Sequence, residues 1–485
     1  MEKYLVKGKY LPTIGVECHV QLKTKTKLFS GVSNDARDAE PNTLISPICL
    51  GFPGTLPVLN NEAVHLAVKA GIALRANIAL VSHFDRKHYF YPDLPKGYQI
   101  TQFERPIVGQ GIVEAPLSGG EFVKVGITRA HLEEDAGKSS HPSGSDYSLV
   151  DLNRAGTPLL EIVSEPDIHS AAEAKAYAHE LYLLMKYAGV SDVDLYHGNM
   201  RFDVNVSVSD DPGKLGIRSE TKNLNSFKSV EKAVEYEINR QIELIEKGQK
   251  IVQETRGWDD AKQKTISQRS KEDAHDYRYF PDPDLPPVEI EQTYIDAMKE
   301  SMPTMPSALR VVFGELGLTE AQIDTIIEEP QMATILRQIN EEKDTKTART
   351  IGNWLTGELQ RSLTDEEITL DQISSVTSQM IILSSMLDSS VLSSTAAKEV
   401  LIEVVKTKKD PEAIAKEKNL LQVSDESELV MIVEQVISEN QKAADDVRSG
   451  EMKAIGFLVG QVMKLSQGRA NPGKVQELLK KQLGV

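Results

Sequence analysis

The sequence predicts an α+β protein in which a sheet-rich N-terminal region precedes a helical C-terminal region. Residues 1 to about 295 are rich in Gly, Pro and β-branched residues, with short runs in which apolar and polar residues alternate. From about residue 295 onward, long glycine-poor stretches carry apolar residues at helical spacing. Alternation with a period of two is typical of strands, and spacing by three or four is typical of helices.

The clearest strand pattern covers residues 13–22. One face carries apolar side chains and the other mostly polar ones: Ile14, Val16, Cys18, Val20 and Leu22 oppose Gly15, Glu17, His19 and Gln21. Residues 201–208 repeat the pattern, and a sheet with one buried and one hydrated face explains both runs. Two helices are expected within this region, at residues 171–188 after Ser170 and at residues 226–247.

Two proline-containing segments divide the chain. The first, residues 280–287, contains four prolines, and the second, residues 406–411, combines three lysines with Asp410 and Pro411. We therefore predict three domains at residues 1–294, 295–408 and 409–485. In the last of these, Gly468 is expected to cap one helix, and Asn471 and Pro472 are expected to begin the final one.

Composition indicates a cytoplasmic globular protein rather than a membrane or secreted one. No apolar run approaches the roughly 20 residues that span a bilayer, and the N-terminus lacks the pattern of a secretory signal. Only two cysteines occur, Cys18 and Cys49, so no disulfide framework is expected. The net charge of −17 argues against a general nucleic-acid binder. Residues 449–485 are the exception, with six Lys or Arg residues against two Glu.

Common nucleotide and hydrolase motifs are absent from the sequence. There is no G-x-x-x-x-G-K-[ST] loop, no G-x-G-x-x-G fingerprint and no G-x-S-x-G elbow. Any use of ATP must therefore proceed without a Walker A motif. The sequence also lacks the Gly/Ser-rich Lys–Ser–Ser pattern of amidases, so a reaction that consumes ammonia would need another chain to produce it.

Acidic and histidine side chains suggest a cation site. Glu17 and His19 lie two apart on a predicted strand, so both point to the same side. An exposed pair on a hydrated strand is the simpler explanation of these two residues alone. The stretch 131–135 (His-Leu-Glu-Glu-Asp) and Glu161, which interrupts an apolar run, add further candidate ligands. Carboxylates with one imidazole suit Mg²⁺ or Mn²⁺ better than zinc.

Residues 85–99 mix aromatic and cationic side chains. Such a segment suits an RNA end or a phosphate group, through stacking and charge pairing. A proline-rich structural loop with solvated lysines explains it equally well.

Several motifs together resemble the GatB family, whose members belong to tRNA-dependent amidotransferases. They occur in the family's order and spacing at residues 15–22, 85–99, 132–138, 150–167, 201–208, 222–227 and 276–281, with further similarity at 456–461 and 468–472. The resemblance implies a mixed, mainly antiparallel sheet domain called the cradle, followed by an all-α region and a helical tail. The basic charge of residues 449–485 favours tRNA binding by this tail, and a docking surface for another subunit is the alternative. The resemblance covers nearly the whole chain.

The resemblance also implies a reaction. Members use ATP and Mg²⁺ to phosphorylate the side-chain carboxylate of Glu or Asp misacylated onto tRNA(Gln) or tRNA(Asn). Ammonia then displaces phosphate, giving Gln-tRNA(Gln) or Asn-tRNA(Asn). A GatA-like amidase chain supplies the ammonia from glutamine, and a small GatC-like chain completes a heterotrimer. The implied enzyme class is a ligase forming carbon–nitrogen bonds (EC 6.3.5.-), and the sequence does not distinguish the two tRNA substrates.

The resemblance carries over to individual residues. Glu17, His19, Glu134 and Glu161 are expected to ligate or orient the metal ion. Lys87 and Lys96 are expected to meet phosphate or guide ammonia, and Tyr89 to shape the pocket. Arg201, Asp203 and Asn205 are expected to line the same hydrated face and bind the nucleotide, although a polar network that only orders the sheet is an equal alternative.

One departure from the family concerns zinc. Some members carry a four-cysteine zinc site, whose positions here are Ser30, Val32, Ser46 and Cys49, so we expect no zinc. Cys18 is expected in the core. The archaeal relative GatE is excluded because 485 residues leave no room for its large insertion. A non-catalytic tRNA-docking scaffold and a metal-dependent hydrolase remain as alternative functions.

Overall fold

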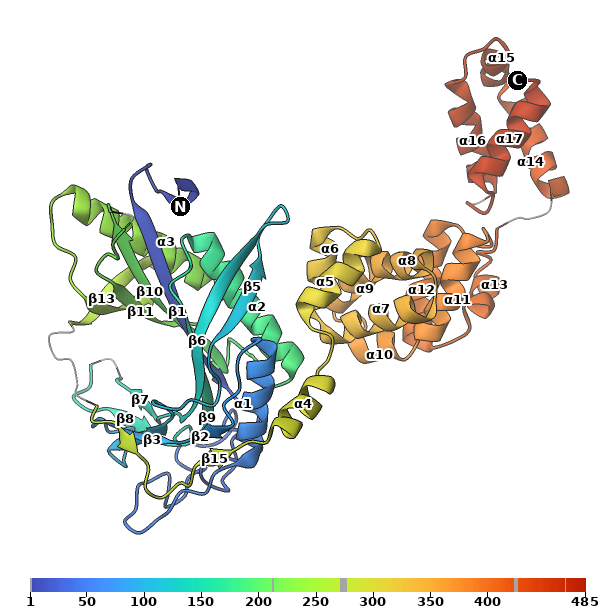
Figure 1. The fold of residues 1–485 in the computed structure, drawn as a ribbon. Coiled ribbons are helices and arrows are strands. Elements are labelled where there is room, and N and C mark those ends of the chain that lie inside the picture. The colour runs from blue at the N-terminus through green and yellow to red at the C-terminus, as the bar shows by residue number, and fades with distance from the viewer. Residues whose placement is uncertain (1, 143, 212, 271–276, 423–425, 467) are drawn as a thin grey trace. The chain divides into compact units, whose positions relative to one another are not determined.

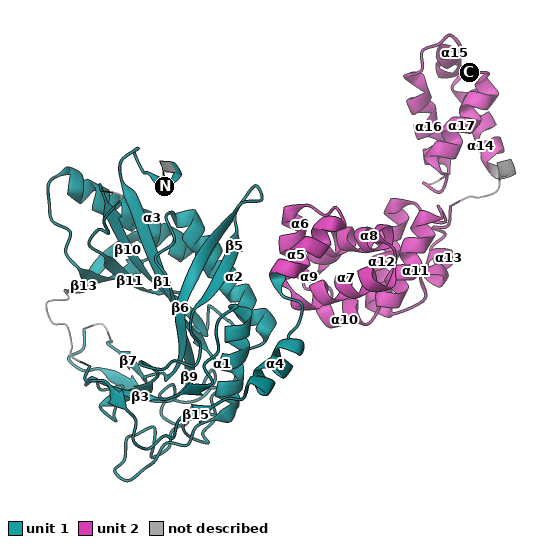
Figure 2. Cartoon of the chain, in the orientation of Figure 1, with its two compact units in different colours: residues 1–306 teal, residues 307–485 magenta. Residues whose placement is uncertain are grey.

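The computed structural model describes residues 2–142, 144–211, 213–270, 277–422, 426–466 and 468–485. The chain divides into two compact units, Met1–Pro306 and Ser307–Val485 (Figure 2). The division falls after helix α4 (Gln292–Glu300), whereas the predicted boundary at residue 294 would cut through that helix. The three-domain division stays a prediction.

Unit 1 is built on a sheet whose strands run in the order β13-β12-β11-β10-β1-β9-β6-β4-β3-β14, with β5 paired to β6 (Figure 1). Every pairing is antiparallel except that of β11 with β12. The strands are β1 (Leu11–Gln21), β3 (Asp85–His88), β4 (Tyr98–Thr101), β5 (Gly111–Pro116), β6 (Phe122–Glu134), β9 (Pro158–Ser164), β10 (Met200–Ser209), β11 (Ser219–Leu224), β12 (Glu254–Asp259), β13 (Lys264–Ser270) and β14 (Phe280–Pro281). This mixed, mainly antiparallel sheet confirms the predicted α+β class.

Shorter elements complete unit 1. They are the 3-10 turn η1 (Glu2–Tyr4), the strand pairs β2 (Val81–Ser82) with β15 (Val288–Glu289) and β7 (Lys138–Ser140) with β8 (Leu149–Asp151), and the helices α1 (Asn61–Ala73), α2 (Ala171–Ala188), α3 (Phe227–Glu246) and α4. Both predicted helices are confirmed. The Ser170 hydroxyl accepts from Glu173 N at the start of α2, and Ser226 does the same for Ser229 N at α3.

The two faces of the sheet differ as the alternation predicted. The apolar side chains of β1 are almost completely buried, and they join one core with residues of α1, α2 and α3. Cys18 belongs to this core, as expected, and burial raises the pKa of its thiol well above its ordinary value. The polar side chains of β1 lie half-buried on the opposite face. The helices thus pack against one face and leave the other for polar chemistry.

Unit 2 consists of helices. They are α5 (Pro306–Glu315), α6 (Glu320–Glu328), α7 (Pro330–Glu342), α8 (Thr345–Thr356), α9 (Glu358–Thr364), α10 (Leu370–Ser374), α11 (Thr377–Asp388), α12 (Ser394–Thr407), α13 (Pro411–Glu417), α14 (Glu426–Glu439), α15 (Gln441–Arg448), α16 (Ala454–Leu465) and α17 (Pro472–Leu483). Apolar residues between Leu429 and Leu483 form a cluster of their own. No helix among the described residues is both long and apolar enough to cross a membrane.

The ends of the last two helices follow the predicted capping. Helix α16 ends at Leu465, and the N–H of Gly468 donates to the Met463 carbonyl at 2.8 Å with φ +76° at the glycine. Such a bond from a residue just beyond the helix satisfies one of its last carbonyls. The Asn471 side chain accepts from Gly473 N and Lys474 N, and Pro472 opens α17. Gly468, Asn471 and Pro472 therefore have the predicted roles.

A buried carboxylate on α3 generates a stability prediction. Glu237 is fully buried, accepts from Ser219 and Thr265, and pairs with Arg240 and Arg256. Burial alone would raise its pKa, but these partners lower the pKa below its ordinary value. Replacing Glu237 with Ala leaves the two guanidinium groups without this partner. We expect a loss of about 3–5 kcal/mol in the free energy of unfolding at neutral pH.

The measurement is urea denaturation of the purified protein, with Glu243→Ala as the matched control. Glu243 lies on the exposed side of the same helix, so its variant should unfold almost like wild type. Because the folded-state pKa of Glu237 is lowered, its stabilisation is present above the ordinary carboxylate pKa. It is lost as the pH falls through the folded-state value, so wild type and variant should converge in acid. Equal stability at pH 7 would contradict the prediction.

Candidate cation and phosphate site

A row of polar side chains crosses four neighbouring strands on the hydrated face of the sheet. Register places His131 of β6 opposite Glu161 of β9, Glu161 opposite His19 of β1, and His19 opposite Arg201 of β10. Side chains opposite one another in an antiparallel pair share a face and lie close together. The row therefore gathers residues from distant parts of the sequence onto one surface.

Four side chains of this region form a cluster, which we call the His19 cluster: His19, His131, Glu133 and Glu161. His19 Nε2 lies 3.6 Å from Glu161 Oε2 and 4.0 Å from Glu133 Oε1. His131 Nε2 lies 3.4 Å from the same Glu161 oxygen and 3.7 Å from Glu133 Oε2. One ligand atom each from His19, Glu133 and Glu161 lies within 4.8 Å of the other two. Two imidazoles and two carboxylates thus converge on one point.

The histidines and carboxylates of the His19 cluster shift each other's pKa values. Burial favours the neutral imidazole, but Glu161 and Glu133 raise the pKa of His131 to about 9. Burial likewise opposes protonation of His19, yet Glu161 raises its pKa above the ordinary value. Burial would raise the pKa of Glu161 itself, but the two histidines hold it well below the ordinary range. Glu161 is therefore an anion that attracts positive charge.

The placement of Glu134 differs from the expected grouping with His19. Its carboxylate forms an ion pair with Lys96 and accepts from the backbone N–H of Ile100 at 2.9 Å. Alternate residues of a strand point to opposite faces, so Glu133 shares the face of His131 and Glu134 does not. The structure thus brings Glu133 into the cluster and pairs the two predicted residues Glu134 and Lys96 with each other.

Glu17 belongs to a second acidic group beside the His19 cluster. Its ligand atom lies within 4.8 Å of those of Asp203 and Glu220, and Asn205 Nδ2 donates to Glu17 Oε1 at 3.0 Å. Burial, together with the neighbouring carboxylates, raises the pKa of Glu17. The Lys222 ammonium lies 3.0 Å from Asp203 and 2.7 Å from Glu220, so this group already contains a cation.

Cationic side chains flank the His19 cluster. Arg201 lies 3.4 Å from Asp135, and this carboxylate raises the pKa of the guanidinium. Burial disfavours the charged form of Lys87, but Glu133 raises its pKa, so the ammonium stays charged. Lys87 Nζ also lies over the rings of Tyr89 and Tyr277, at 5.8 and 4.9 Å from their centroids. Burial raises the pKa of Tyr89, which keeps its hydroxyl protonated.

Sequence reasoning included His131 and Glu133 only within the acidic stretch at residues 131–135 and assigned Glu134 alone from that stretch as a ligand. It missed Glu220 and Lys222 as partners of Asp203, and Asp135 as the partner of Arg201. The stretch at residues 131–135 is visibly acidic, and strict alternation from His131 would have selected Glu133. Lys222 begins the family-like motif at residues 222–227, but no local pattern places it or Glu220 beside Glu17, because their proximity depends on the pairing of β10 with β11.

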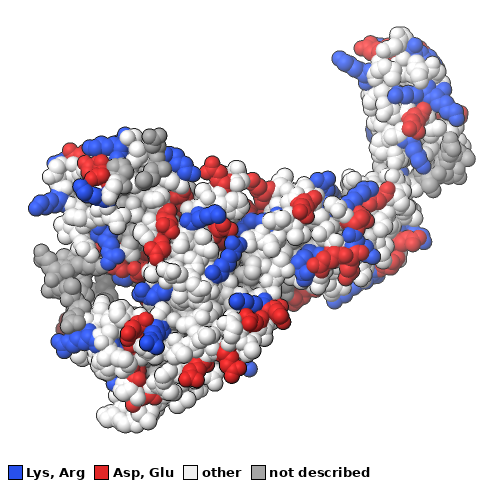
Figure 3. All heavy atoms as spheres, in the orientation of Figure 1, with Lys and Arg blue, Asp and Glu red and all other residues white. Residues whose placement is uncertain are grey.

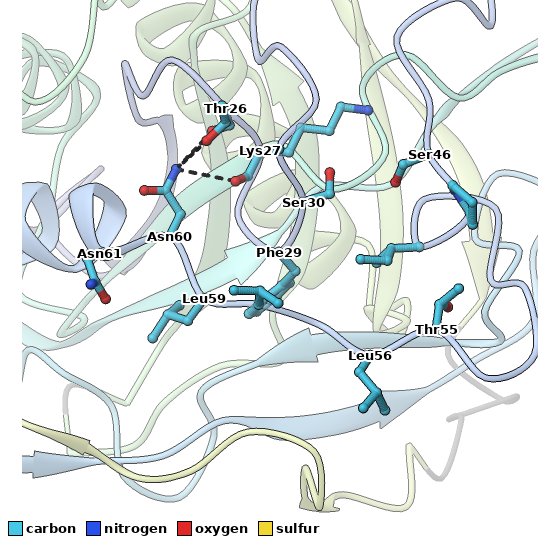
Figure 4. Close-up of a pocket in the computed structure, with 14 residues that line it drawn as sticks. Thr26, Lys27, Phe29, Ser30, Ser46, Thr55, Leu56, Leu59, Asn60 and Asn61 are labelled. Atoms are coloured by element: carbon cyan, nitrogen blue, oxygen red, sulfur yellow. Dashed lines mark hydrogen bonds between the residues drawn. The ribbon is translucent and has the colours of Figure 1, made fainter.

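Three of the four positions of the family's zinc site lie together, and only Cys49 among them carries a thiol. Cys49 Sγ lies 3.2 Å from Ser46 Oγ and 3.7 Å from Ser30 Oγ. Ser30 and Ser46 also line a cavity of about 660 Å³ (Figure 4). The Lys27 ammonium lies 3.7 Å from the same sulfur and donates to the Leu44 carbonyl. A structural zinc ion needs four ligands, so one thiol beside an ammonium does not fit it.

A hard divalent cation does fit the His19 cluster. The donors are the carboxylates of Glu133 and Glu161 and the imidazole of His19, whose ligand atoms lie within 4.8 Å of one another. Among the described residues, no Lys or Arg lies within ion-pair distance of Glu133 or Glu161. The cluster thus presents anionic ligands without an internal ammonium, while Lys87 and Arg201 nearby can attract phosphate or carboxylate oxygens.

Comparisons with known proteins match nearly the whole length of this chain. The model of the GatB/GatE catalytic domain matches residues 12–296, and that of the GatB domain matches residues 334–483. The relative in Caldanaerobacter subterraneus subsp. tengcongensis is 46% identical over 98% of this chain and 99% of its own length. The relative in Trichodesmium erythraeum is 43% identical over 99% of this chain and 98% of its own length. Both are named as a subunit of an aspartyl/glutamyl-tRNA(Asn/Gln) amidotransferase.

These full-length matches confirm the resemblance that the sequence motifs indicated. The chain belongs to the GatB/GatE family.

Proposed function

We propose that this chain is the subunit of a tRNA-dependent amidotransferase that activates the side-chain carboxylate of Glu-tRNA(Gln), Asp-tRNA(Asn) or both. The observation that carries the proposal is the His19 cluster, a set of cation ligands flanked by Lys87 and Arg201 on one face of the sheet. The names of the relatives and the family match support the same reaction. Phosphoryl transfer requires positioning and neutralisation of charge, and this surface offers both.

The cation in this proposal is Mg²⁺ or Mn²⁺, held by His19, Glu133 and Glu161. When bound, it would neutralise charge on the phosphate oxygens of ATP. The sequence also predicts Glu17 and Glu134 as ligands, and we now assign them to orientation, through Asn205 and Lys96 respectively. Lys87 and Arg201 bind the oxygens of the transferred phosphoryl group and of the substrate carboxylate. Tyr89 packs beside Lys87 and restricts its movement.

The reaction has two balanced steps. A carboxylate oxygen of the aminoacyl group attacks the terminal phosphorus of ATP, and ADP leaves with the bond electrons. Ammonia then attacks the carbonyl carbon, phosphate leaves, and the nitrogen gives up a proton. The buried pair of Lys96 and Glu134 is the candidate to guide ammonia and receive that proton.

The remaining components come from partner chains. The sequence shows no amidase signature, so a GatA-like chain would supply ammonia from glutamine and a GatC-like chain would complete the heterotrimer. The complex would then act as a carbon–nitrogen ligase of class EC 6.3.5.-. Two free cysteines and a role in translation support the predicted cytoplasmic location.

The proposed function is tested with the purified complex, ATP, Mg²⁺, glutamine and each misacylated tRNA. We expect ATP-dependent formation of Gln-tRNA(Gln) or Asn-tRNA(Asn), with ADP released in equal amount. In the His19→Ala complex amide formation should fall at least about 100-fold, since a lost cation ligand removes several kcal/mol of charge stabilisation. Glutaminase activity should persist. Undiminished amide formation by the variant would support a tRNA-docking scaffold instead.

Cation binding distinguishes Glu133 from Glu134. We expect Glu133→Gln to weaken Mn²⁺ binding at least about tenfold, because it removes an anionic ligand from the His19 cluster, and Glu134→Gln to weaken it less. Electron paramagnetic resonance of bound Mn²⁺ measures this without any turnover. Thermal unfolding of both variants controls for loss of structure. A larger loss of Mn²⁺ binding in Glu134→Gln than in Glu133→Gln would show that Glu134 is the metal ligand, as the sequence predicts.

The tail generates a further prediction. Residues 449–485 are basic, and Figure 3 shows Lys and Arg side chains on the visible face of this module. Deleting residues 410–485 should weaken tRNA binding by the complex while sparing glutaminase activity. The triple variant Lys474→Ala, Lys480→Ala and Lys481→Ala should lower the salt dependence of tRNA affinity, because fewer counterions are released. Filter binding at several salt concentrations measures both, and unchanged affinity would exclude the tail as a tRNA contact.

A further inference from the structure

A second group of cation ligands lies where β3 begins, apart from the His19 cluster. It consists of His83, Asp85 and Glu104, which we call the His83 group, and one ligand atom of each lies within 4.8 Å of the other two. Asp85 is the first residue of β3, and Glu104 lies three residues beyond the end of β4. Because Asp85 pairs with Thr101 at the end of β4, the chain after that strand returns to the start of β3. The pairing therefore brings the three side chains together.

One strand separates the His83 group from the His19 cluster. Thr101 of β4 pairs with Asp85 on one side and with Glu133 of β6 on the other, and its hydroxyl donates to Glu133 Oε2 at 3.2 Å. Neighbouring strands lie about 4.8 Å apart, so the backbones of Asp85 and Glu133 are about 10 Å apart. A metal ion contacts ligand atoms about 2–2.6 Å away. An ion at the His19 cluster therefore does not serve the His83 group.

The imidazole of His83 directs a nitrogen without a partner toward the two carboxylates. Its Nε2 lies 3.3 Å from Asp85 Oδ1 and 3.8 Å from Glu104 Oε2. This nitrogen is buried, yet it makes no hydrogen bond within the described part of the chain. Two ligand atoms held about 2.1 Å from one ion lie roughly 3.0–3.4 Å apart. A small movement of the exposed Glu104 side chain would give all three atoms this spacing.

The backbone holds Asp85 in position for such a role. Asp85 is buried, and its Oδ2 accepts from Phe103 N at 2.8 Å and from Glu104 N at 3.1 Å. These two bonds leave Oδ1 facing His83. In the ranges that the structure describes, no Lys or Arg lies within ion-pair distance of either carboxylate. The carboxylates are thus oriented as ligands and are not neutralised by an ammonium or guanidinium group.

We propose that His83, Asp85 and Glu104 bind a divalent cation of the Mn²⁺ type, which links the start of β3 to the segment after β4. Imidazole is a ligand of transition metals, and carboxylates suit Mn²⁺. Water completes the coordination on the exposed side of the group. The ion holds in place the segment at Phe103, whose ring stacks on that of Tyr279 with the centroids 4.0 Å apart. Its role is structural, and the inference does not depend on the function proposed above.

The test measures Mn²⁺ binding by the full-length His19→Ala chain after its metals have been removed with EDTA. The His19→Ala change weakens the competing site, so the Mn²⁺ that still binds reports the His83 group. Electron paramagnetic resonance measures the free Mn²⁺ during titration. We expect one Mn²⁺ per chain, and adding His83→Gln should weaken its binding at least about 100-fold, because a ligand is lost.

His65→Gln is the matched control in the same background. His65 is a half-buried histidine of α1 whose Nδ1 lies 2.8 Å from the Tyr294 hydroxyl, so its loss should leave Mn²⁺ binding unchanged. Equal Mn²⁺ binding with and without His83→Gln would overturn the inference and leave His83 as an ion-pair partner of Asp85. Absence of Mn²⁺ binding by the His19→Ala chain would overturn it as well.

His83→Lys distinguishes loss of the ligand from loss of the fold. A lysine ammonium can neutralise both carboxylates without binding a metal ion, as Lys222 does in the Glu17 group. In the His19→Ala background, Mn²⁺ should raise the Tm of the chain with His83 but not that of the chain with His83→Lys. An equal rise in both chains would contradict the inference. The proposed function is tested separately, by amide formation, and stands or falls independently of these results.

Discussion

The alternation of side chains along antiparallel strands is the constraint on which the rest of this structure depends. On β1, the apolar residues join the core that α2 and α3 complete, and the residues between them face the hydrated side. Cys18 and its neighbours Glu17 and His19 illustrate the consequence, because one backbone segment serves both the core and the site. A shift of register by one residue would bury the two polar side chains and expose the apolar ones. The core therefore fixes the positions of the catalytic candidates.

Burial on the hydrated face then decides how each acidic group is neutralised. A buried or half-buried carboxylate needs a nearby positive charge, because removing it from water is costly. For Asp203 and Glu220 this positive charge is the ammonium group of Lys222, a residue of the same chain. Glu133 and Glu161 face imidazoles instead. Near neutral pH an imidazole can lose its proton and coordinate a metal ion, whereas a lysine ammonium group keeps its proton. The histidines beside Glu133 and Glu161 can therefore give up their protons when a metal cation binds.

This difference explains how much of the site could be predicted from the sequence. Local alternation is sufficient to place Glu17 and His19 on one face, and the break in the apolar run at Glu161 marks a third polar position. Whether Glu133 or Glu134 joins the His19 cluster depends on whether the side chains of β6 keep alternating between the two faces up to its last residue. The partnership of Glu17 with Glu220 depends on three strands meeting in one register, although β1 lies far from β10 and β11 in the sequence. Local pattern carries no information about such pairings.

The fold was more predictable than the site for the same physical reason. Helices α2 and α3 and the capping at Gly468 and Asn471 arise from interactions within a few residues. The His19 cluster requires β6, β9 and β1 to be adjacent, and only β9 and β6 are near neighbours in the chain. The cluster also combines histidines with carboxylates of opposite charge, so none of its residues, taken alone in the sequence, indicates that the others are near. Lys222 shows the limit most clearly. It begins one of the motifs that resemble the family, but no local pattern pairs it with Asp203 and Glu220. This pairing is what leaves the His19 cluster, and not the Glu17 group beside it, in need of an external cation.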